Sequence, residues 1–148
     1  MKRGLAILAL VLAPLAARAQ VVAECDDRAL AGSIVEPWEE NSRSFANGDV
    51  RLAVLDTIEP GAAAFNILVL SPPFGMMGER QCRIVSLTRD FGFFAATLNG
   101  MRAAYDPSEG LTFAIDVELF NPQNGLGTPA VLRLTLNQAT GEIGAVVE

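Results

Sequence analysis

The sequence contains no histidine, and its single lysine, Lys2, stands at the start of the chain. The absence of imidazole excludes a Ser-His-Asp triad, a Cys-His pair and a histidine metal site. Without an internal lysine, the chain cannot form a Schiff base with a substrate, and it lacks the lysine of a phosphate-binding P-loop. These absences exclude most of the common enzyme designs.

Cysteine is also scarce, because the chain has only Cys25 and Cys82. Redox enzymes usually place two cysteines as C-x-x-C, and a cysteine nucleophile needs a neighbouring base such as histidine. This chain offers neither arrangement. In an oxidising compartment, two thiols in one small domain are more often paired than free. We therefore predict a structural Cys25–Cys82 disulfide, which contributes roughly 4 kcal/mol by closing a long loop.

The chain has no apolar run of the roughly 20 residues that a membrane-spanning helix needs. Its longest apolar run, residues 5–15, follows the basic pair Lys2 and Arg3 and precedes Ala17-Arg18-Ala19. A basic start, a short apolar run and a small-x-small end are the three parts of a secretory signal peptide. We predict that residues 1–19 are removed after Ala19. Residues 20–148 then form a single exported domain, periplasmic or secreted, with no membrane span.

The signal peptide takes three of the 11 basic residues with it, so eight arginines face 17 acidic residues and the net charge falls from −6 to −9. Nucleic acids and anionic lipid headgroups are bound mainly through positive charge. The charge balance therefore argues against a nucleic-acid partner and suits a basic one. About half of the residues are apolar, which is enough for a folded domain with a core of its own.

Alternation of apolar and polar residues dominates the second half of the chain. Residues 111–119 and 131–137 place their apolar side chains at every second position, which is typical of strands with one buried face. Residues 49–56 and 64–71 are more uniformly apolar, as expected for central strands covered on both faces. The remaining strand candidates are 81–87, 142–147 and, with a helix as the alternative, 94–105.

Turn residues separate these strands. Residues 106–110 and 137–141 have the proline, asparagine and glycine content of hairpin turns. Residues 71–78 are expected to form a loop, because two adjacent prolines do not fit into a ladder of hydrogen bonds. Residues 26–34 fit one short N-terminal helix. The predicted fold is mainly β, a single antiparallel sheet-based domain of six or seven strands; a sandwich, a barrel and a helix-covered sheet stay open.

Two segments are candidates for binding a partner. The first is the polar stretch 36–48, which contains the only tryptophan; tryptophan and arginine are enriched at binding hot spots. The candidate residues in this stretch are Trp38, Glu39, Glu40 and Arg43. The structural alternative is that Trp38 and Phe45 close one end of the core while one of the two glutamates pairs with Arg43.

The second candidate is the loop 71–78. Phe74, Met76 and Met77 could form an apolar contact there, because methionine adapts to irregular surfaces. The structural alternative is that this loop covers the core.

Carboxylates are the remaining groups that could carry chemistry. Glu39 and Glu40 beside Trp38 could act as an acid–base pair on a glycosidic bond if an apolar site held one of them, although neighbouring side chains usually diverge. Asp26-Asp27 and the loop at Asp106 do not match the ligand spacing of an EF-hand. We predict no catalytic residue, no metal site and no cofactor.

Four stretches of the chain resemble one family. They are Trp38-Glu-Glu-Asn-Ser-Arg-Ser-Phe-Ala-Asn-Gly48, Leu70-Ser-Pro-Pro73, Arg80-Gln-Cys-Arg83 and Leu136-Asn-Gln-Ala-Thr-Gly141. They look like a family of small exported proteins from alphaproteobacteria. The resemblance spans most of the chain after the signal peptide and implies a Gram-negative periplasmic setting, but it brings no activity, ligand or catalytic residue.

The sequence thus predicts an exported, non-enzymatic domain that binds a protein or a cell-envelope component. The alternative is a small carboxylate-dependent hydrolase acting on glycans. The oligomeric state stays open.

Overall fold

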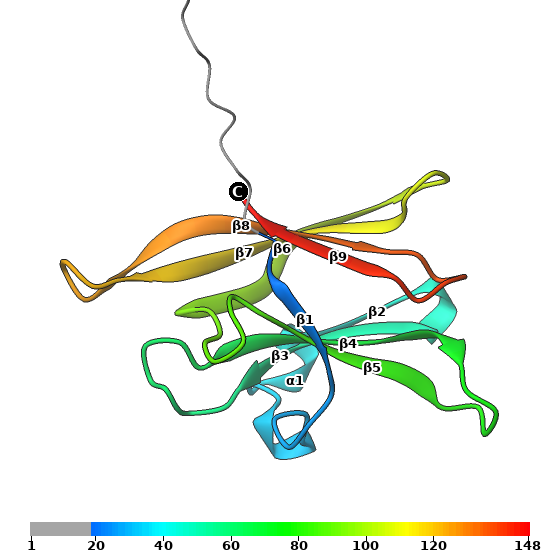
Figure 1. The fold of residues 1–148 in the computed structure, drawn as a ribbon, viewed down its shortest axis with the longest axis horizontal. Helices are drawn as coiled ribbons and strands as arrows, with labels where there is room; N and C mark the ends of the chain where they lie inside the picture. Colours follow the sequence, from blue (N-terminus) through cyan, green and yellow to red (C-terminus); the bar gives the residue numbers. More distant parts are fainter. Residues whose placement is uncertain (1–18) are drawn as a thin grey trace, which may run out of the picture.

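The computed structural model describes residues 19–148, which fold into two antiparallel β-sheets packed face to face (Figure 1). One sheet has five strands in the order β1-β5-β4-β3-β2, and the other has four in the order β6-β7-β8-β9. The strands are β1 (Val21–Glu24), β2 (Ser42–Phe45), β3 (Val50–Asp56), β4 (Phe65–Phe74), β5 (Arg80–Ser86), β6 (Ala95–Asp106), β7 (Gly110–Asn121), β8 (Leu126–Leu136) and β9 (Ile143–Val147). The predicted mainly β, antiparallel fold is confirmed, and its architecture is a sandwich that does not close into a barrel within residues 19–148.

Seven of these strands correspond to stretches expected from the sequence, and β6 settles the ambiguous residues 94–105 as a strand. The two shortest strands, β1 and β2, were not predicted. The hairpin turns at 106–110 and 137–141 connect β6 to β7 and β8 to β9, as expected. The predicted signal peptide, apart from Ala19, lies outside the described residues.

The main core lies between the two sheets. In β7, Phe113, Ile115 and Val117 point inward and are almost completely buried, while Asp116 points outward and is exposed. The same alternation places Leu132, Leu134 and Leu136 of β8 in the core. A twisted sheet that buries one side of each strand requires this period of two, so the alternation read from the sequence correctly identified the buried face.

A second, smaller core lies on the outer face of the five-stranded sheet. Its buried members are Ala53, Leu55, Leu68 and Ile84, and the segment after β1 packs over them through Cys25, Ala29 and Ile34. The central strands β3 and β4 are therefore buried on both faces. This explains why their sequences are uniformly apolar instead of alternating.

The predicted helix over residues 26–34 is wrong. The covering segment contains a turn and a short 3-10 helix, η1 (Ala31–Ser33). The Asp26 carboxylate accepts a hydrogen bond from the Arg28 backbone N–H at 3.0 Å, a local bond that competes with helix formation. The only α-helix in the described residues is one turn long, α1 (Trp38–Asn41), and lies in the polar stretch 36–48.

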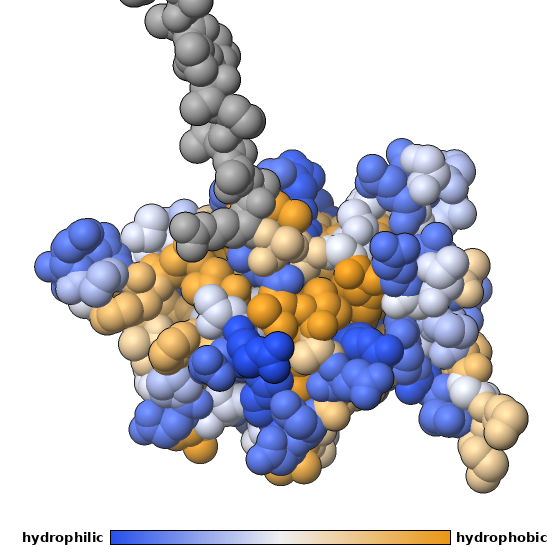
Figure 2. Space-filling model, in the orientation of Figure 1, coloured by the Kyte–Doolittle hydropathy of each residue, from blue (hydrophilic) through white to orange (hydrophobic). Residues whose placement is uncertain are grey.

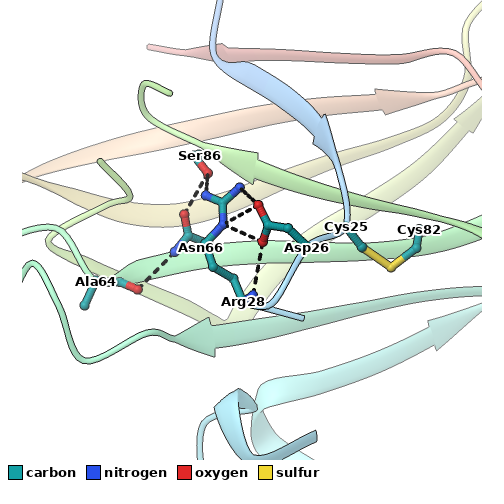
Figure 3. Close-up of polar contacts among 7 residues, drawn as sticks. All are labelled: Cys25, Asp26, Arg28, Ala64, Asn66, Cys82 and Ser86. Carbon is teal, nitrogen blue, oxygen red and sulfur yellow. Dashed lines mark hydrogen bonds and ion pairs between the residues drawn. A yellow bond between two sulfur atoms is a disulfide. The ribbon is translucent and has the colours of Figure 1, made fainter. Parts of the chain in front are cut away.

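A disulfide and a polar network hold the covering segment in place (Figure 3). Cys25 is bonded to Cys82 of β5, with Cα atoms 5.4 Å apart, so the predicted pairing is confirmed. Arg28 donates to the Asp26 carboxylate at 2.8 Å and to Ser86 Oγ at 3.3 Å. Ser86 in turn donates to Asn66 Oδ1 at 2.7 Å. The network satisfies polar groups at the almost fully buried Asn66 and Ser86, which would otherwise destabilise this apolar face.

The expectation of a loop at the two prolines is wrong, because Pro72 and Pro73 lie inside β4. The register explains how the strand accommodates them. Ser71 is opposite Gln81 and Phe74 is opposite Arg80, so the two prolines fall in a bulge that has no partner residues on β5. Proline cannot donate to a ladder, and a bulge is a position in a strand where it need not.

The two open sides of the sandwich are bridged differently. On one side, Gln20 donates from its backbone N–H to Ala145 of β9 at 2.9 Å, and so links the chain just before β1 to the other sheet. On the other side, Arg43 of β2 reaches Asn99 of β6 at 3.3 Å. Among residues 19–148, no helix has the length and apolar content to cross a membrane.

Candidate functional site

The first group of predicted residues lies on α1 and β2, at the edge of the five-stranded sheet. Trp38 is about half exposed, at 49%, and Glu39 and Glu40 are exposed beside it. Arg43 forms none of the ion pairs found in the described residues. Its guanidinium instead donates to the backbone oxygens of Glu39 and Ser42 and to the side chain of Asn99. The arginine therefore holds α1 against β6 by hydrogen bonds to uncharged oxygens, and both glutamates are exposed at the surface.

This geometry also bears on the structural alternative and on the hydrolase alternative. Phe45 does join the core, with its ring centroid 4.9 Å from that of Phe113, but Trp38 does not belong to the core. An acid catalyst among carboxylates needs apolar surroundings that set it apart from its partner. Glu39 and Glu40 are both exposed, so nothing in their surroundings favours glycan hydrolysis.

The second predicted group forms the tip of the β4–β5 hairpin. Phe74 is 49% exposed, and Met76 and Met77 are exposed almost completely. The hairpin projects from the body of the sandwich, and Figure 2 shows an apolar end at the lower right over this tip. The tip does not cover the core. The structure does not bring it together with Trp38, because α1, which contains Trp38, packs against β6 of the other sheet and against β2.

An apolar pocket that the sequence did not reveal lies at the other end of the sandwich. The loops after β3, β5 and β7 gather there (Figure 1) and enclose a pocket of about 470 Å³, which we name the end pocket. Its walls are almost entirely apolar and include Pro60, Ala62, Leu87, Phe91, Phe120 and Pro122. A pocket of a few hundred cubic ångströms with apolar and aromatic walls is typical of a binding site.

Two aromatic side chains at the end pocket, Phe91 and Phe120, are exposed to solvent to an unusual extent for such large apolar groups. Phe91 is 52% exposed and Phe120 is 42% exposed. Phe120 stacks on Phe94 with ring centroids 5.9 Å apart, which fixes one wall. Figure 2 shows apolar atoms over this left-hand end of the molecule. Exposed aromatic rings that border a concave apolar surface indicate a place where another molecule binds.

Hydrogen bonds hold the loops of the end pocket in one arrangement. Gly92 donates to the Ala63 carbonyl at 2.8 Å, and Phe65 and Phe93 exchange backbone hydrogen bonds at 3.1 and 2.6 Å. A Cβ atom at Gly92 would collide with the carbonyl oxygen of Phe65, so this close approach requires glycine. Thr88 and Phe91 close the neighbouring turn with a bond of 2.9 Å. The pocket is therefore preformed, which lowers the entropic cost of binding.

The loop after β3 also contains backbone strain. Ile58 has a φ of 67°, a left-handed conformation that is unusual for a β-branched residue, and its side chain is 76% exposed. Its N–H is held by the Asp56 carboxylate at 2.7 Å. Ile58 therefore exposes an apolar side chain two residues before Pro60 of the pocket wall.

A second hollow, of 560 Å³, lies on the outer face of the four-stranded sheet. Its lining combines small side chains such as Ala95 and Val131 with the acidic Asp116, Glu118 and Glu148. Glu148 is paired with Arg133 at 2.7 Å. Within residues 19–148, no three or more Cys, Asp or Glu side chains come together as a metal-binding group. Two carboxylates with a lowered pKa, Asp26 and Asp106, do not line this hollow. The pKa of Asp26 is lowered chiefly by the Arg28 side chain, and that of Asp106 chiefly by the Ser108 hydroxyl.

Comparison with known proteins adds no family to this geometry, because no family model, no curated protein and no solved structure matches the chain. The resemblance to a family of small exported proteins stays a prediction.

Sequence reasoning missed the end pocket for an identifiable reason. Its residues come from three loops that are far apart in the chain and meet only through the sandwich topology. A weak signal was present, because Phe91 stands beside Gly92 and Phe120 precedes the Asn121-Pro122 turn. Aromatic residues in segments dominated by turn residues are unusual, and that pattern would have directed attention to this end.

Proposed function

We propose that the protein is an exported binding domain without catalytic activity, which holds an apolar part of a protein or envelope component in the end pocket. The observation that carries the proposal is the pocket's almost wholly apolar wall, bordered by the half-exposed rings of Phe91 and Phe120. The Cys25–Cys82 disulfide supports an oxidising compartment. The hydrogen-bonded loops support a rigid site.

The apolar character of the walls sets the kind of group that binds. Burial of apolar surface contributes roughly 25 cal/mol for each Å² removed from water, whereas a charged group placed there would lose its hydration without gaining a partner. The site therefore takes an aliphatic or aromatic group and rejects a charged one. Polar contacts at the rim, such as that of Thr88, add orientation more than affinity.

The test compares two phenylalanines that are exposed to nearly the same extent. Phe91→Asp places a charge at the end pocket, and Phe74→Asp places the same charge on the hairpin tip, where the side chain is 49% exposed. Each variant, and Trp38→Ala, is used in a crosslinking pull-down from periplasm after its thermal unfolding has been shown to match the wild type. We expect a single partner to be captured by the wild type, Phe74→Asp and Trp38→Ala, and to be lost with Phe91→Asp.

The opposite pattern would reject the end pocket. If the partner is lost with Phe74→Asp or Trp38→Ala and kept with Phe91→Asp, binding uses one of the surfaces first suggested by the sequence. A further variant, Ala62→Trp, fills the pocket without adding charge. It should reduce capture as Phe91→Asp does, and full capture by a folded Ala62→Trp protein would also exclude the pocket.

A further inference from the structure

The second half of β6, residues 102–106, is an open sheet edge. β6 is the last strand of the four-stranded sheet, and it pairs with β7 from Arg102↔Ala114 to Asp106↔Gly110. No strand of the described residues pairs with its other side. All five residues are exposed, and the Tyr105 side chain is 67% exposed. This hairpin end projects beyond the sandwich (Figure 1).

Open edges are sites of strand pairing unless something blocks them. In an antiparallel sheet, every second residue of an edge strand directs its N–H and C=O groups away from the neighbouring strand. Proteins usually protect such an edge with a bulge, a proline or charges. In β6 the register shift lies between Thr97 and Arg102, so it protects the first half of the strand only. Residues 102–106 keep a regular register.

The charges on this edge are arranged so that they favour a second copy of the same strand. The sequence is Arg102-Ala-Ala-Tyr-Asp106, with a cation at one end and an anion at the other. When two such strands run antiparallel about a two-fold axis at Ala104, Arg102 lies opposite Asp106 of the second copy, and this happens twice. Opposite charges on directly opposed residues stabilise a strand pair, whereas like charges destabilise it.

The same register also suits the remaining side chains. Tyr105 lies opposite Ala103 of the second copy, which leaves room for the ring on both sides of the axis. Moving the axis to Ala103 or Tyr105 removes the charge pairing, and the axis at Tyr105 also places Ala103 opposite Pro107, which has no N–H to donate. A two-fold pair is self-complementary by definition, and this short edge meets that condition in one register.

We propose that two copies of the protein pair antiparallel through residues 102–106 of β6, which joins their four-stranded sheets into one continuous sheet of eight strands. The pairing leaves both end pockets open, because Phe120 and the Asp106–Gly110 turn lie at opposite ends of β7. The proposal does not depend on the end pocket, and it adds a bivalent assembly whose two pockets could bind one extended partner more tightly than a single copy does.

Charge reversal tests the pairing. Arg102→Asp gives the edge a negative charge at both 102 and 106, and Asp106→Arg gives it a positive charge at both positions. Like charges then face each other in a pair of identical copies, so each variant alone should dimerise less. In sedimentation experiments over a range of protein concentrations, we expect each variant to weaken the dimer about tenfold or more. A mixture of the two variants should restore the dimer, because each Arg then faces an Asp.

The matched control is Arg133→Asp. Arg133 and Arg102 both lie opposite Ala114, on either side of it, but Arg133 belongs to the interior strand β8. This control should leave the dimer unchanged. Since Asp106 also accepts hydrogen bonds from Ser108, the Asp106→Arg protein must first be shown to be folded; rescue in the mixture then separates lost pairing from a damaged turn.

A cysteine at the axis tests the register. Both native cysteines are bonded to each other, so a new thiol has no other partner in the described part of the chain. Ala104→Cys should form a disulfide between two copies on mild oxidation, and Ala103→Cys should form much less of it. A wild type that is monomeric at all concentrations, equal crosslinking at both positions, or no rescue in the mixture would each overturn the proposal.

Discussion

The five-stranded sheet is buried on both faces, whereas the four-stranded sheet is buried only on its inner face. On the outer face of the first, a segment tethered by Cys25–Cys82 covers Leu55, Leu68 and Ile84. On the outer face of the second, no segment of the described residues covers Asp116 or its neighbours on β7. Each outer face thus avoids exposing large apolar side chains to water, but in a different way: the first is covered by a chain segment, and the second has polar and small side chains.

The difference shows what the disulfide does. The covering segment contains little regular structure, so few backbone hydrogen bonds hold it to the sheet. Cys25 donates to the Cys82 carbonyl at 3.2 Å at its start, and Val35 donates to the Val54 carbonyl at 3.0 Å at its end. Between these points, packing and the Arg28 network hold it. A covalent tether reduces the entropy that the unfolded chain would gain by releasing this segment.

Removal of the disulfide is expected to have the largest effect. The double variant Cys25→Ala/Cys82→Ala opens a loop with a sequence separation of 57, and the free energy of unfolding should fall by about 4 kcal/mol. Urea unfolding of the variant and the wild type measures the loss. Amide exchange should accelerate in β4 and β5 more than in β7 and β8. Uniform acceleration in both sheets would show that the tether stabilises the whole sandwich and not one outer face.

The next largest effect separates the two outer faces directly. Leu68→Ala removes a side chain that is buried under the covering segment, and we expect a loss of about 3 kcal/mol. Val131→Ala removes a half-buried side chain from the outer face of β8, and its cost should be about 1 kcal/mol or less. Thermal and urea unfolding of both variants give the comparison. Equal losses of unfolding free energy in the two variants would mean that the covering segment does not keep water away from the outer face of the five-stranded sheet.

A polar substitution should have a smaller effect in the same direction. Ser86→Ala removes the hydroxyl that donates to Asn66 Oδ1 at 2.7 Å, in a place where Asn66 is 2% exposed. The unpaired amide oxygen should lower the free energy of unfolding by about 2 kcal/mol. Thr135→Ala, on the outer face of β8, serves as the control and should change it by about 0.5 kcal/mol or less. If Thr135→Ala lowers the free energy of unfolding as much as Ser86→Ala does, the buried hydrogen bond between Ser86 and Asn66 adds no more stability than an exposed hydroxyl.

The same contrast explains which parts of the fold could be predicted from the sequence. Strands with one exposed face, such as β7 and β8, can be predicted from the alternation of apolar and polar residues, and their inward residues were identified correctly. Strands with two buried faces, such as β3 and β4, were recognised as central because they lack alternation. The cover itself was assigned wrongly as a helix, because its structure depends on tertiary packing and on the Asp26–Arg28 contact instead of on a repeating pattern.

The candidate sites were harder to predict than the fold. Sequence reasoning selected Trp38 and the Phe74 loop because their residue types stand out, and the structure shows both at the surface but apart from each other. The end pocket could not be selected, since Phe91 and Phe120 are separated by nearly 30 residues and meet only because β6 and β7 run back and forth across the sandwich. Proximity of loops is a property of topology, which one sequence without relatives does not reveal.

The smallest expected effect is a dependence of stability on pH that originates in the cover. The Arg28 side chain lowers the pKa of the Asp26 carboxyl in the folded protein below its ordinary value of 3.8. A carboxyl whose pKa is lower in the folded state stabilises the fold above its unfolded pKa, and the stabilisation is lost as the pH falls through the folded pKa. Asp26 and Arg28 are partly exposed, so solvent screening keeps the effect small.

The variant Asp26→Asn isolates this contribution. At pH 7 it should be slightly less stable than the wild type, and the difference should shrink as the pH falls below 3.8 and through the lowered pKa of the folded protein, because the wild-type carboxyl then becomes protonated as well. Asp27→Asn is the control, since Asp27 forms none of the ion pairs of the described residues. Urea midpoints between pH 7 and pH 2.5 measure both variants. A difference for Asp26→Asn that stays constant over this range would mean that the hydrogen bonds of Asp26, and not its charge, hold the covering segment on the five-stranded sheet.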